Sequence, residues 1–171
     1  RRGGYTTICL GKISHYPDGR LFAYDHSGSG EPEMPHSWDH VGLPYGPWQN
    51  GWDAFFGYAG GKGRVRGESP PIESADVRDD EYPDGLIAGA AIDALQKQQR
   101  RLTEGGGPFL MCVGFFKPHL PFCAPQKYFD LYKLEDVPLP ANPEPPKGVN
   151  PRSLRQSGEP FGNYQHESQD P

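Results

Sequence analysis

The sequence predicts an α/β domain in which a mostly parallel β-sheet is flanked by helices and joined by long loops. Residues 5–10 begin with four β-branched or aromatic residues, end with Cys and Leu, and lie between glycines, which predicts a short buried strand. Residues 85–102 carry apolar side chains at helical spacing, and residues 109–115 form a second apolar run. A helix that leads into a strand with two apolar faces is half of a β-α-β unit, and such units build parallel sheets.

The predicted helix has a signal at each end. Asp84 is a suitable N-cap residue, and the three glycines at 105–107 are expected to stop the helix before Pro108 opens the next strand. The positions that share one face of this helix are Ile87, Ala91, Ala94, Leu95, Gln98 and Leu102.

The remaining regions carry turn signals rather than a sustained period. Residues 16–75 hold 11 of the 23 glycines and all three tryptophans, and we expect ordered loops there. A short helix is predicted near 126–132, the six prolines of 138–151 predict an extended surface segment, and the polar residues 152–171 predict a loose tail. The aromatic side chains of the first region are expected to pack over the body or to line a substrate cleft: Trp38, Trp48, Trp52, Phe55, Phe56 and Tyr58.

Composition limits the possible partners. The 171 residues suffice for one domain with a modest core or for part of a larger one. The net charge of −5 gives no overall attraction to nucleic acid or anionic lipid, and no apolar run is long enough to span a membrane. Three cysteines cannot all pair with one another, and Cys9 and Cys112 lie inside apolar runs where free buried thiols are expected. The oligomeric state is left open.

Two apolar runs end in the same way. The first is followed by Gly11, Lys12 and His15, and the second by Gly114, Lys117 and His119. Ligands bind just beyond the carboxyl ends of strands in open parallel sheets. Two such ends, each with a cation and an imidazole, predict an anion site, although each pair alone is equally compatible with a solvated lysine and a histidine bonded to backbone.

Three other patterns are weaker. His36 and His40 have the spacing of a helical zinc pair, but their surroundings are rich in proline and the glutamate of the hydrolytic motif is missing. Residues 57–63 are glycine-rich like a phosphate loop but lack its spacing, so a turn is expected. An acidic group could collect calcium, although a solvated loop ending in a helix cap is the simpler interpretation: Asp76, Asp79, Asp80, Glu81 and Asp84.

Residues 4–15 resemble the second signature of the sulfatase family, in which Gly-Tyr-x-Thr is followed by Gly-Lys-x-x-His. Residues 109–122, which contain Lys-Pro-His-Leu-Pro-Phe, resemble the matching strand and loop of the iduronate-2-sulfatase branch. Residues 84–95, with their Asp-Gly-Leu-Ile-Ala opening, are similar to the helix before that strand. The resemblance covers about residues 3–135, which we expect to be a central part of a sulfatase catalytic domain, with 136–171 as a loosely ordered extension.

This resemblance implies an alkaline-phosphatase-like α/β sandwich that hydrolyses a sulfate ester on a sugar, using a formylglycine and a calcium ion. It implies that Lys12 binds a sulfate oxygen and the nucleophile's oxygen, and that His15 bonds the formylglycine hydroxyl and helps to expel sulfate. His119 would contact the sulfate and protonate the leaving alcohol, and Lys117 is a further candidate for substrate binding. A periplasmic, secreted or lysosomal location is expected from the family.

The resemblance also shows what this stretch lacks. The family's Cys-x-Pro-Ser-Arg nucleophile motif lies upstream of the Lys–His signature, and Cys123 matches it only in outline and in the wrong order. The family's calcium ligands are missing too, so we expect both cofactors to depend on residues outside this chain and residues 1–171 alone to be inactive. Two alternatives stay open: a phosphatase or phosphodiesterase of the same superfamily, and a non-catalytic module that binds sulfated glycans.

Overall fold

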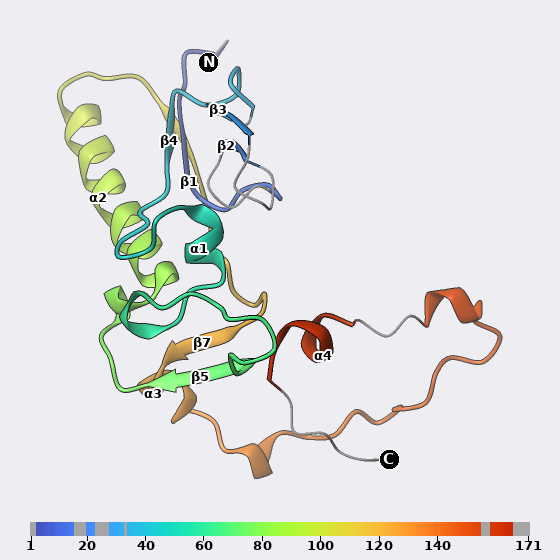
Figure 1. Cartoon of the computed structure of the whole chain (residues 1–171). Helices are drawn as coiled ribbons and strands as arrows, with labels where there is room; N and C mark the ends of the chain where they lie inside the picture. The colour runs from blue at the N-terminus through green and yellow to red at the C-terminus, as the bar shows by residue number, and fades with distance from the viewer. Residues whose placement is uncertain (1–2, 16–19, 23–27, 33, 155–157, 166–171) are drawn as a thin grey trace.

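Three parallel strands form the main sheet of the computed structural model, which describes residues 3–15, 20–22, 28–32, 34–154 and 158–165 (Figure 1). β1 (Thr6–Gly11) lies between β4 (His40–Gly42) and β6 (Phe109–Gly114). Every residue of β1 pairs with β6, from Thr6 beside Phe109 to Gly11 beside Gly114. The two strands predicted from their apolar runs are confirmed, and so is the α/β fold class.

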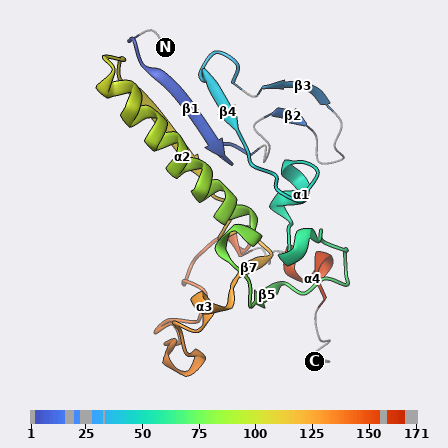
Figure 2. The ribbon, with the colours of Figure 1, turned by 90° about the vertical axis from the view of Figure 1, so that its left-hand side faces the viewer.

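One long helix, α2 (Pro83–Thr103), packs against β1 and β6 (Figure 2). Ile87, in the first half of this helix, is fully buried, whereas Leu95 and Leu102, in its second half, are almost half exposed. The predicted helix is confirmed, but the predicted N-cap is wrong, because Tyr82 precedes the helix and Asp84 lies in its first turn. The carboxylate of Asp84 accepts hydrogen bonds from a loop of β6 instead, which leaves it unavailable to cap its own helix.

Short elements interrupt the region expected to be loop. β2 (Arg20–Phe22) and β3 (Gly28–Pro32) pair antiparallel, and β5 (Ile72–Ala75) pairs parallel with β7 (Phe122–Pro125) in a second small sheet. The remaining turns of helix, most of them 3₁₀, are α1 (Gly51–Phe55), η1 (Ala59–Gly61), η2 (Asp79–Glu81), α3 (Gln126–Phe129), η3 (Leu134–Asp136), η4 (Pro151–Ser153) and α4 (Glu159–Asn163). These elements have three to five residues each, too few for a period to be recognised in sequence.

The largest core cluster lies below the carboxyl ends of β1 and β6. Its buried members are Trp48, Trp52, Ala54, Phe55, Ile87 and Phe116. Four of the six aromatic side chains predicted to pack over the body are buried: Trp48, Trp52, Phe55 and Tyr58. The opposite face of the sheet is more open in the described residues, since Leu110 of β6 is 50% exposed, so the expectation of helices on both faces of this strand is met on one face only.

The C-terminal part is better ordered than expected. In the proline-rich segment, residues 138–148 are exposed and belong to no helix or strand, Val149 is half-buried, and Pro151 begins η4. The expectation of a loose tail is wrong for residues 158–165, because Tyr164 is buried to 1% exposure and Gln165 donates a backbone hydrogen bond to Ser69. One aromatic anchor is enough to dock a segment that has no apolar period. Residues 166–171 of the predicted tail lie outside the described residues.

Candidate active site

The carboxyl ends of β1 and β6 meet at a pair of glycines. Gly11 has a positive φ of 73°, and a Cβ there would lie 2.1 Å from the carbonyl oxygen of Gly114. The amide of Lys12 donates to that same carbonyl at 2.9 Å. Because neither position leaves room for a side chain, the two strands leave the sheet side by side, and the residues that follow them start from adjacent points.

Helix α1 supplies an aromatic surface beyond these strand ends (Figures 1 and 2). The Asn50 side chain caps it by accepting from the amides of Trp52 at 2.9 Å and Asp53 at 3.0 Å. The cap fixes a single turn whose rings touch one another: Trp52 and Phe55 have centroids 5.8 Å apart, and Phe55 and Phe56 have centroids 4.7 Å apart. We call Trp52, Phe55 and Phe56 the aromatic plate.

Three predicted site residues gather on the aromatic plate. The Nζ of Lys12 lies 5.7 Å from the centre of the Phe55 ring, within the range of a cation–π contact. The His119 ring lies 4.4 Å from Phe55, centre to centre, and the His15 ring lies 6.5 Å from Trp52 in an edge contact. The structure therefore brings Lys12, His15 and His119 together around one buried cluster.

The His119 ring is oriented from two sides. Its Nδ1 lies 2.8 Å from the carbonyl oxygen of Leu120, which can only accept, so Nδ1 carries the proton of this bond. Its Nε2 faces Oε1 of Glu159 at 3.7 Å, and the two side chains are 40% and 35% exposed. The atom of His119 that is left to meet a ligand is therefore Nε2.

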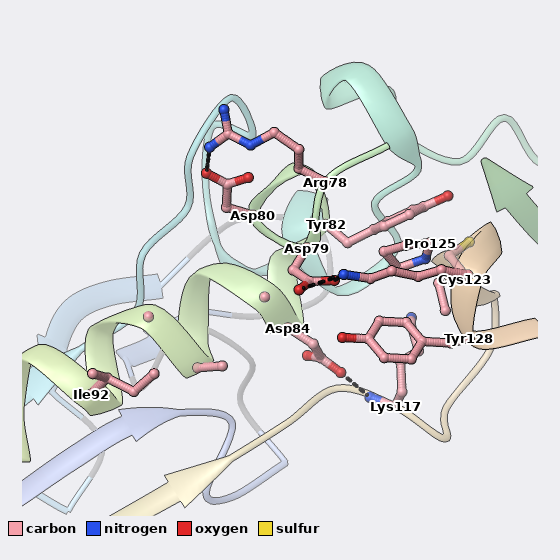
Figure 3. A pocket seen from close by; sticks show the side chains of 15 residues that line it. Arg78, Asp79, Asp80, Tyr82, Asp84, Ile92, Lys117, Cys123, Pro125 and Tyr128 are labelled. Carbon is pink, nitrogen blue, oxygen red and sulfur yellow. Dashed lines mark hydrogen bonds and ion pairs between the residues drawn. The ribbon is translucent and has the colours of Figure 1, made fainter. Parts of the chain in front are cut away.

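Lys117 lies apart from the other three side chains. It lines a pocket of about 730 Å³ between α2 and the β7–α3 segment, where Figure 3 shows it beside Asp84, Cys123 and Tyr128. Lys12, His15 and His119 are not among the residues of this pocket. The Nζ of Lys117 is buried without a hydrogen-bond partner among the described residues, and this burial lowers the pKa of Lys117. The structure does not bring Lys117 to the aromatic plate.

Asp84 fixes the loop that leads to His119. Its two carboxylate oxygens accept from the backbone amides of Phe116 at 2.8 Å and Lys117 at 2.9 Å. Burial raises the pKa of Asp84, against the opposing effect of those two amides and of the Lys117 charge. The first turn of α2 is thereby tied to the end of β6.

The cysteine that outwardly matches a nucleophile motif is not suited to that role. The Cys123 thiol is buried, and its burial raises its pKa to about 12, so almost no thiolate exists at neutral pH. Cys9 and Cys112 are neighbours across β1 and β6, and neither forms a disulfide. Cys9 is buried as expected, whereas Cys112 is only partly buried.

The weaker patterns form ordinary local structure. Asp79 pairs with Lys127 at 2.8 Å, which lowers the pKa of that carboxyl, and Asp80 pairs with Arg78. The 57–63 segment is a tight turn in which Tyr58 donates to the carbonyl of Lys62 at 2.8 Å. Within the parts of the chain that the structure describes, no three His, Cys, Asp or Glu side chains come close enough to hold a metal ion. No described helix is long and apolar enough to cross a membrane.

Three features of the site were not predicted from sequence. The sequence left open whether the aromatic side chains of the plate pack over the body or line a cleft, and it did not predict the turn of helix that joins them, although Asn50 before an aromatic-rich stretch is a usable cap signal. Arg64 stacks on the Phe56 ring at 3.7 Å, and its Nη1 lies 3.4 Å from the Tyr164 hydroxyl. Glu159 reaches His119 from a segment expected to be loose. The contacts of Arg64 with Tyr164 and of Glu159 with His119 join distant parts of the chain, and no local pattern marks them.

The chain is similar to several characterised proteins, although no protein-family model matches it. It is 29% identical over 152 residues to iduronate 2-sulfatase of Homo sapiens, covering 88% of this chain and 25% of that protein. It is 28% identical over 174 aligned residues to a sulfatase of Formosa agariphila, covering 90% of this chain and 29% of that protein. A stretch of 52 residues is 44% identical to the multifunctional alkaline phosphatase superfamily protein PehA of Trinickia caryophylli.

These similarities extend over nearly the whole chain, which itself spans between a quarter and a third of the length of the two sulfatases. They agree with the α/β fold class of the structure. The chain is therefore similar, over nearly its whole length, to one segment of these sulfatases, and a shorter stretch is similar to a protein of the alkaline phosphatase superfamily.

Proposed function

We propose that this chain provides the sulfate-binding side of the active site of a sulfuric ester hydrolase that acts on sulfated carbohydrate. The observation that carries the proposal is the convergence of Lys12, His15 and His119 on the aromatic plate, in a chain similar to sulfatases. Iduronate 2-sulfate is one candidate substrate, because one relative is an iduronate 2-sulfatase, and other sulfated sugars are candidates for the same site. A periplasmic, secreted or lysosomal location would suit such substrates.

Lys12 and His15 are suited to hold the sulfate group. A sulfuryl group in transfer spreads negative charge over its oxygens, and cations held in place stabilise that charge without having to reorganise. Lys12 is partly buried and its Nζ rests against the Phe55 ring, so its ammonium group is held at the strand end rather than free in solvent. His15 is exposed, and its ring can donate a hydrogen bond to a ligand that lies beside Trp52.

His119 is suited to donate a proton to the leaving alcohol. With Nδ1 bonded to Leu120, the exchangeable proton on the ligand side belongs to Nε2. Imidazole transfers protons efficiently near neutral pH. The alcohol oxygen gains negative charge as its bond to sulfur breaks, and a proton from Nε2 completes the alcohol and leaves a neutral imidazole.

The family's calcium ion and formylglycine do not fit the described residues of this chain. No described acidic cluster is built like a metal site, and Cys123 is buried with a raised pKa and lines the same pocket as Lys117, away from the aromatic plate. None of the described residues is assigned to either group. The chain's own contribution is to bind the sulfate and to donate the proton.

Turnover by the intact gene product tests the proposal. Expressed with its natural flanking sequence, the protein should hydrolyse an aryl sulfate and a sulfated disaccharide, and Lys12→Ala or His119→Ala should each lower kcat/KM by roughly 100-fold or more. Lys97→Ala, on the exposed face of α2, is the control and should leave the rate unchanged. Purified residues 1–171 alone should give no calcium-dependent turnover, and clear turnover would show that this segment is a complete enzyme.

The same assay separates the two alternatives. A phosphatase or phosphodiesterase would turn over an aryl phosphate ester in preference to the sulfate. A non-catalytic glycan-binding module would bind sulfated oligosaccharide without turnover, and this binding would survive the loss of Lys12 and His15. Neither alternative explains the Lys-Pro-His loop at 117–119 together with the Gly-Lys-x-x-His segment at 11–15.

A further inference from the structure

The α4 segment returns to the candidate site after a long exposed excursion (Figure 1). Residues 131–148 are all exposed, whereas residues 158–165 dock again on the 64–70 loop. Tyr164 is the anchor, with 1% exposure, and two backbone bonds secure it: Gln165 donates to Ser69 at 2.8 Å, and Gly67 donates to Asn163 at 3.2 Å. The position of α4 is thus set by specific contacts.

This docking places a carboxylate at the ligand-facing atom of His119. Glu159 Oε1 lies 3.7 Å from Nε2, and the other ring nitrogen is already bonded to Leu120. Nearby cationic groups also face the aromatic plate: Arg64 lies over Phe56 and Lys12 lies over Phe55. Glu159 therefore adds a negative charge to a site whose other charged side chains on the plate are positive or, for histidine, can become so.

We propose that Glu159 is an internal competitor for the anion site, so that a sulfate group binds His119 only by displacing this carboxylate. The proposal rests on the proposed function, because it assumes that the aromatic plate gathers an anion site. A carboxylate and a sulfate oxygen accept the same N–H, and two anions cannot share it at close range without repulsion. Binding thus selects sulfate esters that also engage Lys12 and His15, and it disfavours anions that reach His119 alone.

Sulfate binding to the full 171-residue chain tests this. The histidine ring signals are followed by NMR during titration with inorganic sulfate at about pH 6. Glu159→Gln should tighten the dissociation constant reported by His119 by about fivefold, the size expected for an exposed ion pair. Tyr164→Ala should have a similar effect, because it releases α4 and leaves the Glu159 charge in place.

Glu144→Gln is the matched control, because it makes the same charge change in the exposed proline-rich segment. It should leave sulfate binding unchanged. Equal dissociation constants for Glu159→Gln and Glu144→Gln would overturn the internal competitor, and so would weaker binding by Glu159→Gln. If Lys12→Met leaves sulfate binding by the parent chain unaltered, the proposed function itself fails, and this outcome is distinct from a null effect at Glu159.

Discussion

Replacing Gly114 with alanine should separate the two strand ends that carry the candidate site. The new Cβ would lie 1.8 Å from the carbonyl oxygen of Lys12 and 3.0 Å from a side-chain carbon of Ile13. Comfortable contacts between non-bonded heavy atoms begin at about 3.5 Å, so the backbone would have to shift by roughly 1.7 Å. That shift breaks the 2.9 Å bond from the Lys12 amide to Gly114. Overpacking and one lost hydrogen bond together predict a loss of about 2–4 kcal/mol in the free energy of unfolding.

Urea denaturation followed by tryptophan fluorescence measures this loss, because Trp48 and Trp52 lie in the core below the strand ends. Gly89→Ala is the control: a Cβ there meets nothing within 4 Å, and the position lies inside α2. It should stabilise the chain by about 1 kcal/mol, because alanine favours a helix more than glycine does. A Gly114→Ala variant as stable as the parent chain would refute the close approach of β1 and β6.

Three other perturbations test separate parts of the account. Burial lowers the pKa of Lys117 below its unfolded value, so unfolding takes up a proton at pH values between the two. The free energy of unfolding should therefore rise with pH between the lowered pKa and about 10.5. Lys117→Met should flatten this rise in denaturation curves measured across that range. Cys123, with a pKa of about 12, should react with a thiol reagent at about pH 8 at least roughly 100-fold more slowly in the folded chain than in urea, and equal rates would contradict its burial. Phe55→Leu should lower the free energy of unfolding by about 1–2 kcal/mol in urea denaturation. It should also weaken sulfate binding, because Lys12 and His119 both contact this ring. Unaltered sulfate binding would show that the aromatic plate is not part of the site.

The parts of the fold with a sustained pattern could be predicted. β1 and β6 follow from their apolar runs, and α2 follows from its helical period and the glycines after it. The meeting of Lys12 and His119 also follows, because the carboxyl ends of parallel neighbours lie at one edge of a sheet. Sequence periodicity is sufficient where an element is long enough to repeat it.

The rest depends on tertiary contacts that leave no local trace. Asp84 reads as a cap in sequence, yet its carboxylate binds the amides of a loop more than thirty residues away. Lys117 and His119 are two residues apart in sequence. The turn held by Asp84 nevertheless places Lys117 in the pocket between α2 and the β7–α3 segment and His119 against Phe55. Glu159 reaches His119 only because Tyr164 anchors α4.

The most direct test of the central claim asks whether Lys12, His15 and His119 bind one anion together. Titration of the chain with methyl sulfate, followed through the ring signals of both histidines, should give a single dissociation constant for His15 and His119. Lys12→Met should abolish both responses, because the lysine supplies the fixed positive charge of the proposed site. Two unrelated dissociation constants, or histidine responses that persist without Lys12, would show that the strand ends do not form one site.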